Sequence, residues 1–291
     1  MPNCKFFIVD VFAERKFEGN QLAVFLCEKD MSTTEMQKIA KEMNYSETTF
    51  ITSVENYDVR IFTPEAELPF AGHPTIGTAY VLQQEIVKSH IKTILLNLKI
   101  GQIPVLFKYK GGKPEEIWME QNSPTFMKYV DPVLISEVLN IKEGDIDARF
   151  PIQEVSTGIP FIIVPLKTLD VLKGINVNRE KFLDLVETTE AKSILVFCPE
   201  TRNKGNQLSV RVFVHYYGIP EDPATGSGNG CLAAFLAKYQ YWGKSKIDIR
   251  VEQGYEVGRP SLLLLKAEEK EGNISVEVGG KAFIVAKGEL I

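Results

Sequence analysis

Two glycine- and proline-containing loops, each followed directly by an apolar helix-forming segment, constrain this chain more than any other feature. The first loop, residues 218–230 (GIPEDPATGSGNG), precedes an alanine-rich segment that ends near residue 239. The second, residues 68–77 (LPFAGHPTIG), precedes residues 78–82 (TAYVL). Because turn-forming residues give way abruptly to helix-forming ones, each loop is predicted to open a helix, the first at residues 223–226.

A helix start of this kind suits a small anion. The first N–H groups of a helix have no partner inside the helix, and the helix dipole favours negative charge there. Gly226, Gly228 and Gly230 carry no side chain that would keep a ligand away from the backbone. Each loop therefore predicts a site for a phosphate or carboxylate group.

The surroundings of the two loops resemble each other, which indicates an internal duplication. Residues 59–62 (VRIF) and 210–213 (VRVF) each precede one of the loops. A repeat of about 150 residues is typical of a duplicated domain and not of a solenoid. We place the boundary between residues 118 and 130, which gives domains of residues 1–120 and 121–291. A cleft between two such domains is a common place for a small ligand.

Start, stop and periodicity signals predict several other elements. Ser32 and Glu35 form a capping box that opens a helix ending near Met43. A second helix is predicted over residues 74–85, after the loop that contains His73. Near the C-terminus, Gly279-Gly280 separates two β-rich segments and predicts the two-residue turn of a hairpin.

Composition limits the classes of function. The 291 residues are 44% hydrophobic and 24% charged, which is ordinary for a soluble globular protein. The net charge of −5 and the lack of a basic run argue against a nucleic-acid or anionic-membrane partner. No segment approaches the roughly 20 apolar residues of a membrane helix, and the N-terminus lacks a signal-peptide pattern. We therefore expect a cytoplasmic protein.

Cysteine and histidine usage predicts neither a disulfide framework nor a metal site. The cysteines are far apart in the sequence and share no CxxC spacing, so reduced, mostly buried thiols are expected. Three histidines without clustering give no metal-binding pattern. The four cysteines are Cys4, Cys27, Cys198 and Cys231.

Three common motifs fail at the first loop. Residues 225–229 (TGSGN) are not a G-x-S-x-G nucleophile elbow, because both outer glycines are missing. Gly226 and Gly228 lack the third glycine of a dinucleotide fingerprint, since Cys231 stands in its place. No lysine follows where a phosphate-binding P-loop requires one. A nucleotide-binding fold is therefore not favoured.

Seven short blocks, in order along nearly the whole chain, together resemble the PhzF-like family, which is named for the phenazine-biosynthesis isomerase. The resemblance implies the diaminopimelate-epimerase-like fold, an α/β (α+β) architecture. Two pseudo-symmetric domains each wrap a mostly antiparallel, barrel-like sheet around a central helix. It also implies an active site between the domains and a homodimer. The blocks are residues 10–12 (DVF) with 19–20 (GN), 46–50 (SETTF), 62–64 (FTP), 67–74 (ELPFAGHP), 156–158 (STG), 221–227 (EDPATGS) and 258–260 (GRP).

The resemblance also separates two kinds of chemistry. Epimerases of this fold use two opposed cysteines at the starts of the central helices, where this chain has Ala71 and Thr225. Neither residue can exchange a proton with carbon, so racemisation by two bases is not expected. PhzF-like members instead use a glutamate, a histidine, an aspartate and a serine. In this sequence the matching residues are Glu47, His73, Asp222 and Ser227.

Each of these four residues also has a structural interpretation. Glu47 could be a solvated loop carboxylate, and His73 could cap its helix. Asp222 could be a turn former before proline, and Ser227 could be a helix N-cap. The family blocks favour function for all four, although Ser227 could serve both roles.

The sequence departs from the family pattern at two positions, and neither departure removes one of the four candidate site residues. Gln21 stands where proline is common after Gly-Asn, and Gly228 stands where alanine is common after the serine. Gly228 could slightly reshape the anion-binding loop. Asp10 and Arg60 are interpreted as structural.

The sequence therefore predicts a cofactor-independent isomerase in the interdomain cleft. Glu47 would take a proton from one carbon of a small carboxylate-bearing substrate and return it to another carbon on the same face. His73 and Asp222 would be catalytic beside Glu47, while Gly72, Gly226 and Ser227 would bind the substrate. No metal or cofactor is expected, because helix starts and His73 can stabilise an enolate-like charge. The alternative is a non-catalytic protein that binds a small anionic metabolite.

Overall fold

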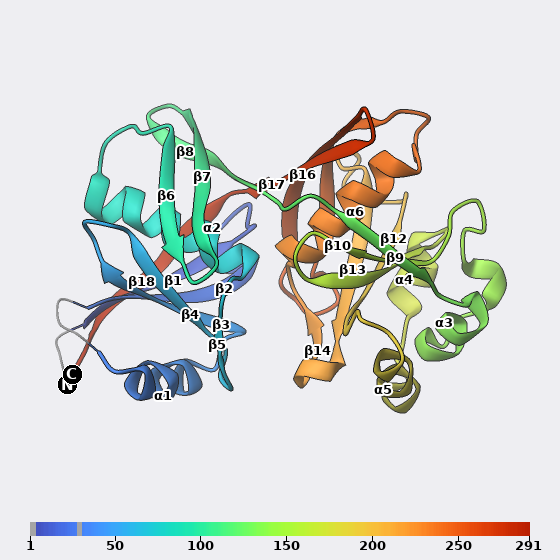
Figure 1. Ribbon diagram of the computed structural model, residues 1–291, viewed down its shortest axis with the longest axis horizontal. Coiled ribbons are helices and arrows are strands. Elements are labelled where there is room, and N and C mark those ends of the chain that lie inside the picture. Colours follow the sequence, from blue (N-terminus) through green and yellow to red (C-terminus); the bar gives the residue numbers. More distant parts are fainter. Residues whose placement is uncertain (1–3, 28–30) are drawn as a thin grey trace. The chain divides into compact units, whose positions relative to one another are not determined.

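The computed structural model describes residues 4–27 and 31–291, which fall into two α/β units (Figure 1). One unit combines Met1–Met119 with Gly279–Ile291, and the other is Glu120–Val278. Residues 279–291, which the predicted domains place in the second half, thus group with the first unit. The reason is that the last strand, β18 (Ala282–Leu290), pairs antiparallel with the first strand of the chain.

The first unit is built around the helix α2 (Gly72–Val81), which continues as the π-helix η1 (Leu82–Val87). Strands pair in the order β18-β1-β2-β3-β4, and only the β2–β3 pair in this run is parallel. β4 also pairs with β5 and, at one residue, with β6, and β6, β7 and β8 follow as antiparallel neighbours. The strands are β1 (Cys4–Val11), β2 (Asn20–Cys27), β3 (Glu47–Ser53), β4 (Asp58–Phe62), β5 (Glu67–Leu68), β6 (Thr93–Leu98), β7 (Gly101–Lys110) and β8 (Lys113–Glu120).

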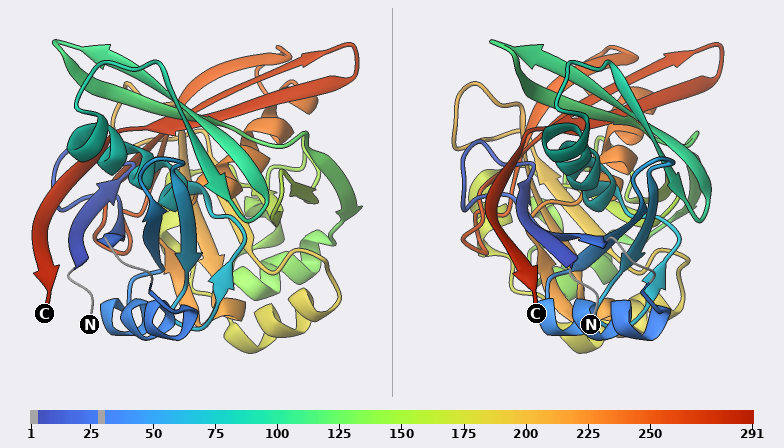
Figure 2. Two further views of the ribbon diagram at one scale, coloured as in Figure 1. Left: turned by 60° about the vertical axis from the view of Figure 1, so that its left-hand side comes forward. Right: turned by 90° about the vertical axis from the view of Figure 1, so that its left-hand side faces the viewer.

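Two helices cover opposite faces of this sheet. α2 lies against β1, β2 and β3 (Figure 2). Its residues are almost all buried. The helix α1 (Thr33–Met43) lies against β3 and β4, where Met36 shares a core cluster with Phe25. Leu22 contacts α2 at Gly77. Because side chains alternate along a strand, Leu22 and Phe25 point to opposite faces of β2.

The second unit repeats this plan around α6 (Gly226–Lys238), which contacts five strands and is buried along most of its length. Adjacent strands pair antiparallel except β11 with β12 and β13 with β15, which are parallel. The strands are β9 (Thr125–Tyr129), β10 (Gln153–Ser156), β11 (Pro160–Pro165), β12 (Ile194–Cys198), β13 (Leu208–Val214), β14 (Ile219–Asp222), β15 (Lys246–Gln253), β16 (Ser261–Lys270) and β17 (Asn273–Gly280).

Three short helices of the second unit pack on its sheet, and together they form a hydrophobic core cluster. α3, α4 and α5 contribute Ile135, Leu172 and Phe182 to this cluster, where they meet residues of β11 and β12. The helices of this unit besides α6 are α3 (Pro132–Leu139), α4 (Leu169–Gly174), α5 (Arg179–Glu187) and the 3-10 turns η2 (Glu143–Asp145) and η3 (His215–Tyr217).

Most predicted boundaries agree with the structure, and one turn does not. The capping box is present, since the Ser32 and Glu35 side chains each bond the other's backbone N–H. The predicted turn at Gly279-Gly280 is wrong. Both residues belong to β17, and neither has the positive φ that a two-residue hairpin turn needs. Gly279 lies under the ring of Trp118, where an added Cβ would come within 2.4 Å of the indole.

The expectation of four reduced cysteines is wrong for one pair. Cys4 and Cys27 form a disulfide, with Cα atoms 4.3 Å apart. They lie directly opposite each other in the antiparallel pairing of β1 with β2, so their separation of 23 residues in the sequence is misleading. Cys198 and Cys231 are buried free thiols. Among the described residues, no helix is long and apolar enough to cross a membrane.

Close packing of α2 on the first sheet gives a testable expectation. A Cβ at Gly77 would lie 2.6 Å from Leu22 Cδ2 and 2.8 Å from Val11 Cγ2. We expect Gly77→Ala to lower the free energy of unfolding by about 1–3 kcal/mol, because overpacking outweighs the gain in helix propensity. Urea unfolding measures this change.

The corresponding substitution in α6 is the matched control. A Cβ at Gly228 would lie no closer than 3.2 Å, against side-chain atoms of Leu195 and Phe161 that can adjust. Gly228→Ala should therefore change the free energy of unfolding by less than about 1 kcal/mol, since small shifts and helix propensity offset each other. Equal losses in the two variants would contradict the closer packing of α2.

Candidate active site

The first unit holds one half of the predicted site, made of Glu47, Gly72 and His73. Glu47 is the first residue of β3, and Gly72 and His73 are the first two residues of α2. The Glu47 side chain is 17% exposed and that of His73 is 7% exposed. Glu47 Oε2 lies 3.4 Å from His73 Nε2. A partly accessible carboxyl group thus adjoins a buried imidazole at a helix start.

The contact between Glu47 and His73 is not an ion pair, because the imidazole is neutral. Burial lowers the pKa of His73 to about 3, and a hydrogen bond with the backbone of Gln21 opposes this shift only in part. A bond that favours the charged ring is one in which the ring donates, here to the Gln21 carbonyl. Since Nε2 faces Glu47, we assign the proton to Nδ1. The unprotonated Nε2 is then directed at the Glu47 carboxyl group.

The second unit holds the other half, made of Asp222, Gly226 and Ser227. Asp222 ends β14, and Gly226 and Ser227 are the first two residues of α6. Gly226 is buried, whereas Asp222 and Ser227 are partly exposed. The N-cap residue is Thr225, so Ser227 does not take the N-cap position that its structural interpretation required.

A buried amide network fixes the loop that leads into α6. Gln253, which is 1% exposed, donates through Nε2 to the Asp222 carbonyl at 2.8 Å and to the Thr225 hydroxyl at 3.0 Å. Its Oε1 accepts from the Thr225 N–H at 3.2 Å and from Asn229 Nδ2 at 2.8 Å. The Thr225 hydroxyl in turn donates to the Asp222 carboxylate. This network orients the Asp222 side chain.

Sequence reasoning did not find Gln253 or Asn229. Gln253 lies 28 residues after Thr225, at the end of β15, and is an unremarkable glutamine in the sequence. The Gln21 carbonyl was missed for a similar reason, because any residue at that position would supply it. Asp10, interpreted as structural, accepts the Phe17 N–H at 2.6 Å and so supports the turn between β1 and β2.

The starts of the two central helices differ from those of the other α-helices. α1, α3, α4 and α5 all have an N-cap side chain that accepts a hydrogen bond from the first turn. α2 has Ala71 at this position, and α6 has Thr225, whose side chain makes no capping bond. Neither helix has an acidic residue in its first turn. The first N–H groups of both helices therefore lack the usual side-chain acceptor, which suits an anionic ligand.

The positions where a two-base mechanism needs cysteines cannot supply bases. Ala71 has no titratable group, and the Thr225 hydroxyl is bound to Asp222 and Gln253. Cys231, farther along α6, is fully buried, and burial raises the pKa of its thiol to about 12. The thiol is therefore protonated at neutral pH.

The buried neutral His73 predicts an acid-sensitive fold. Its pKa is about 3 in the folded protein and about 6.5 in the unfolded chain, so between these values the unfolded chain binds more protons. The free energy of unfolding should fall as the pH drops from about 6.5, with a slope of at most about 1.4 kcal/mol per pH unit. Urea unfolding between pH 7 and pH 4.5 measures the slope.

Two histidine variants isolate this effect. His73→Gln should show a shallower fall with pH than the wild type, whereas the exposed His90→Gln should follow the wild type. Because Glu47 faces the ring, the same comparison in a Glu47→Gln background removes its contribution. Parallel pH dependence for His73→Gln and the wild type would contradict a buried neutral imidazole.

Comparison with known proteins places this chain in a family. A family model described as phenazine biosynthesis-like protein matches residues 9–288. The chain belongs to the phenazine biosynthesis-like family. Among its relatives in this family is the trans-2,3-dihydro-3-hydroxyanthranilate isomerase of Pseudomonas aeruginosa, which is 33% identical over 290 residues, or 98% of each chain.

Solved structures agree with this assignment. The PhzF-family phenazine biosynthesis protein of Bacillus anthracis superposes with a TM-score of 0.91, at 27% identity over the whole of both chains. A hydroxyproline epimerase from Agrobacterium vitis matches with a TM-score of 0.60 at 9% identity, covering 100% of this chain and 94% of that one. The second likeness concerns the fold alone. The predicted PhzF-like family and epimerase-like α/β fold are thus confirmed.

Proposed function

We propose that this protein is a cofactor-independent isomerase in which Glu47 moves a proton between two carbons of one substrate molecule. The observation that carries the proposal is the pairing of a partly accessible glutamate with a buried, neutral histidine at a helix start. A carboxyl group in such a place can both take and return a proton. The unprotonated Nε2 of His73 can accept a hydrogen bond from Glu47 only while that carboxyl group carries a proton, so it favours the protonated carboxyl group formed after proton removal.

The substrate class follows from the two helix starts. α2 and α6 each present a first turn without side-chain capping and without acidic residues. A substrate carboxylate would accept hydrogen bonds from the N–H groups around Ser227 and Gly226. In this proposal Glu47 acts on the reacting carbons of the substrate, and Asp222 binds one of its polar groups. We propose a small carboxylate-bearing compound of the trans-2,3-dihydro-3-hydroxyanthranilate type, because a relative with 33% identity is named for that substrate.

The proposed reaction balances without an outside reagent. Glu47 takes a proton from one carbon, and the electron pair of that C–H bond enters the conjugated system of the substrate. The helix starts stabilise the enolate-like charge that develops. The same proton, or one exchanged from the carboxyl group, then goes to another carbon on the same face. Substrate and product are isomers, and Glu47 ends in its starting state.

Direct assay tests the proposal against a purely binding function. The wild type is incubated with trans-2,3-dihydro-3-hydroxyanthranilate, and the product is followed by absorbance and by NMR. We expect isomerisation, with saturation kinetics. Calorimetric binding of this compound without any product would contradict the proposal and support a metabolite-binding protein. If the compound neither binds nor reacts, related dihydro-aromatic amino acids are assayed, and failure of that whole class would overturn the proposed substrate type.

A further inference from the structure

An arginine–glutamate pair joins β4 to β5, the short strand that precedes α2 in the chain. Arg60 on β4 donates from Nε to Glu67 Oε1 and from Nη2 to Glu67 Oε2, both at 2.8 Å. Nη2 also donates to the Thr33 hydroxyl at 2.9 Å, which ties the pair to the start of α1. The guanidinium carbon lies 5.1 Å from the centre of the Phe62 ring. The Arg60 side chain is therefore held in one orientation.

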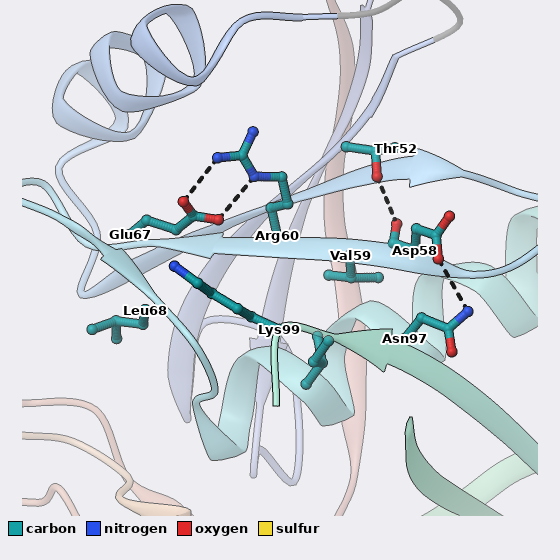
Figure 3. A pocket seen from close by; sticks show the side chains of 9 residues that line it. Thr52, Asp58, Val59, Arg60, Glu67, Leu68, Asn97 and Lys99 are labelled. Carbon is teal, nitrogen blue, oxygen red and sulfur yellow. Dashed lines mark hydrogen bonds and ion pairs between the residues drawn. The ribbon is translucent and has the colours of Figure 1, made fainter. Parts of the chain in front are cut away.

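Figure 3 shows this pair in the wall of a cavity of about 310 Å³. The Lys99 ammonium group points toward Glu67 from the turn after β6. The hydrogen bonds from Arg60 and, to a smaller extent, the charge of Lys99 lower the pKa of Glu67. Glu67 is therefore ionised at neutral pH, and the pair keeps its two parallel hydrogen bonds.

The second unit has a matching pair at the start of α6. Arg211 on β13 donates from Nε to Glu221 Oε1 at 3.0 Å and from Nη2 to Glu221 Oε2 at 2.6 Å. Its Nη1 donates to the carbonyls of Leu172 and Ile175 at 3.0 and 3.1 Å. The side chains of the pair are only 9% and 7% exposed. As in the first unit, the guanidinium lies over a phenylalanine two residues on, here Phe213 at 4.8 Å.

The two pairs occupy equivalent places in the chain. Glu67 lies on β5, five residues before Gly72, and Glu221 lies on β14, five residues before Gly226. In each unit the arginine belongs to the strand that pairs antiparallel with the glutamate's strand. Each pair therefore fixes the short strand from which the chain turns into a central helix.

In the second unit the Arg211–Glu221 pair also sets the orientation of the Asp222 side chain. Glu221 and Asp222 are neighbours on β14, so their side chains leave the strand on opposite faces. A two-point contact between Arg211 and Glu221 stops the strand from rotating about its axis. Asp222 is thereby directed to the face where Thr225 donates to it.

We propose that Arg60–Glu67 and Arg211–Glu221 are matched positioning pairs that hold the two half-sites in reactive geometry. This inference rests on the proposed isomerase function. In this proposal the pairs are positioning residues and not catalytic ones. They act through the chain segments that carry Gly72 with His73 and Asp222 with Ser227.

Arginine-to-lysine variants test the proposal, because lysine keeps the charge but loses the two-point geometry. In Arg211→Lys and Arg60→Lys we expect kcat to fall by about 10–100-fold while KM changes less than threefold, because misplaced groups weaken transition-state contacts. Arg149→Lys is the control, since Arg149 makes the same kind of two-point contact with Asp147, outside both half-sites. All rates are measured well below the melting temperature of each variant.

Hydrogen exchange supplies a readout that needs no substrate. Arg211→Lys should speed amide exchange at residues 222 and 224–227 at least tenfold and leave residues 71–73 unchanged, and Arg60→Lys should do the reverse. A loss of melting temperature without these local changes, or faster exchange with unchanged kcat, would overturn the proposal. If the wild type turns over no substrate, the proposed function fails separately. The exchange pattern then decides alone whether the pairs hold the helix starts.

Discussion

Replacing Glu47 by glutamine is expected to lower kcat by about 10²–10⁴-fold, because an amide cannot accept and return a proton. KM should change little, since in the proposed function the helix starts and not Glu47 bind the substrate carboxylate. Glu47→Asp keeps the acid but withdraws it by one methylene, so it should retain part of the rate. Initial rates at saturating substrate measure both effects.

Two controls show whether the loss of rate comes from misfolding or from the change in net charge. The Glu47 side chain is 17% exposed at the start of β3, so glutamine should be tolerated there, and circular dichroism checks the fold. Glu42→Gln removes the same charge from an exposed position on α1 and should keep the wild-type rate. If Glu47→Gln retained the wild-type kcat, Glu47 would have no role in proton transfer.

Gly254→Ala is expected to lower the free energy of unfolding by more than about 3 kcal/mol, because it combines a left-handed backbone with two steric conflicts. Gly254 has φ +81°, and an added Cβ would lie 2.3 Å from the Arg259 carbonyl oxygen and 2.4 Å from that of Pro223. Neither backbone oxygen can move alone. Displacement of Pro223 would also disturb Asp222 beside it.

Gly258→Ala is the matched control for this prediction. Gly258 has φ +71°, but nothing lies within 4 Å of an added Cβ. Its substitution should cost only the left-handed backbone penalty of about 1–2 kcal/mol. Urea unfolding compares the two variants. Equal losses would mean that the Pro223 loop does not depend on close contact with the turn after β15.

The sequence predicted the elements whose signals are local. The capping box at Ser32 and the helix starts near His73 and Gly226 each depend on a few neighbouring residues, and all appear in the structure. The repeat of the Val-Arg-x-Phe segments predicted two similar units. It did not reveal that the arginine of each segment makes a two-point contact with a glutamate on the strand before a central helix. Such side-chain pairing cannot be derived from a strand pattern alone.

Features that depend on tertiary contacts escaped prediction. The Cys4–Cys27 disulfide depends on the register of β1 with β2. Gly279 looked like a turn former, yet it is a strand residue that leaves room for the Trp118 ring. Gln253 reaches the candidate site only because the fold brings the end of β15 next to the start of α6. In each case the residue that makes the decisive contact lies more than 20 residues away in the sequence.

The candidate site itself was named largely through the family blocks. Composition alone would have left Glu47 as a solvated carboxylate. The structure adds the contact with His73 and the physical reason for its neutrality, which is burial. It also adds the contrast between uncapped central helices and capped peripheral ones, which no single motif displays.

Solvent deuterium incorporation tests the central claim most directly. The reaction is run in D₂O with trans-2,3-dihydro-3-hydroxyanthranilate, and both product and recovered substrate are analysed by NMR and mass spectrometry. The Glu47 mechanism predicts that the wild type forms product with deuterium at the carbon that receives the proton, to the extent that the proton on Glu47 exchanges with solvent before it is returned. It also predicts that Glu47→Gln forms product and incorporates deuterium about 10²–10⁴-fold more slowly than the wild type. Deuterium entry at the wild-type rate in Glu47→Gln would show that another group moves the proton and would contradict the mechanism.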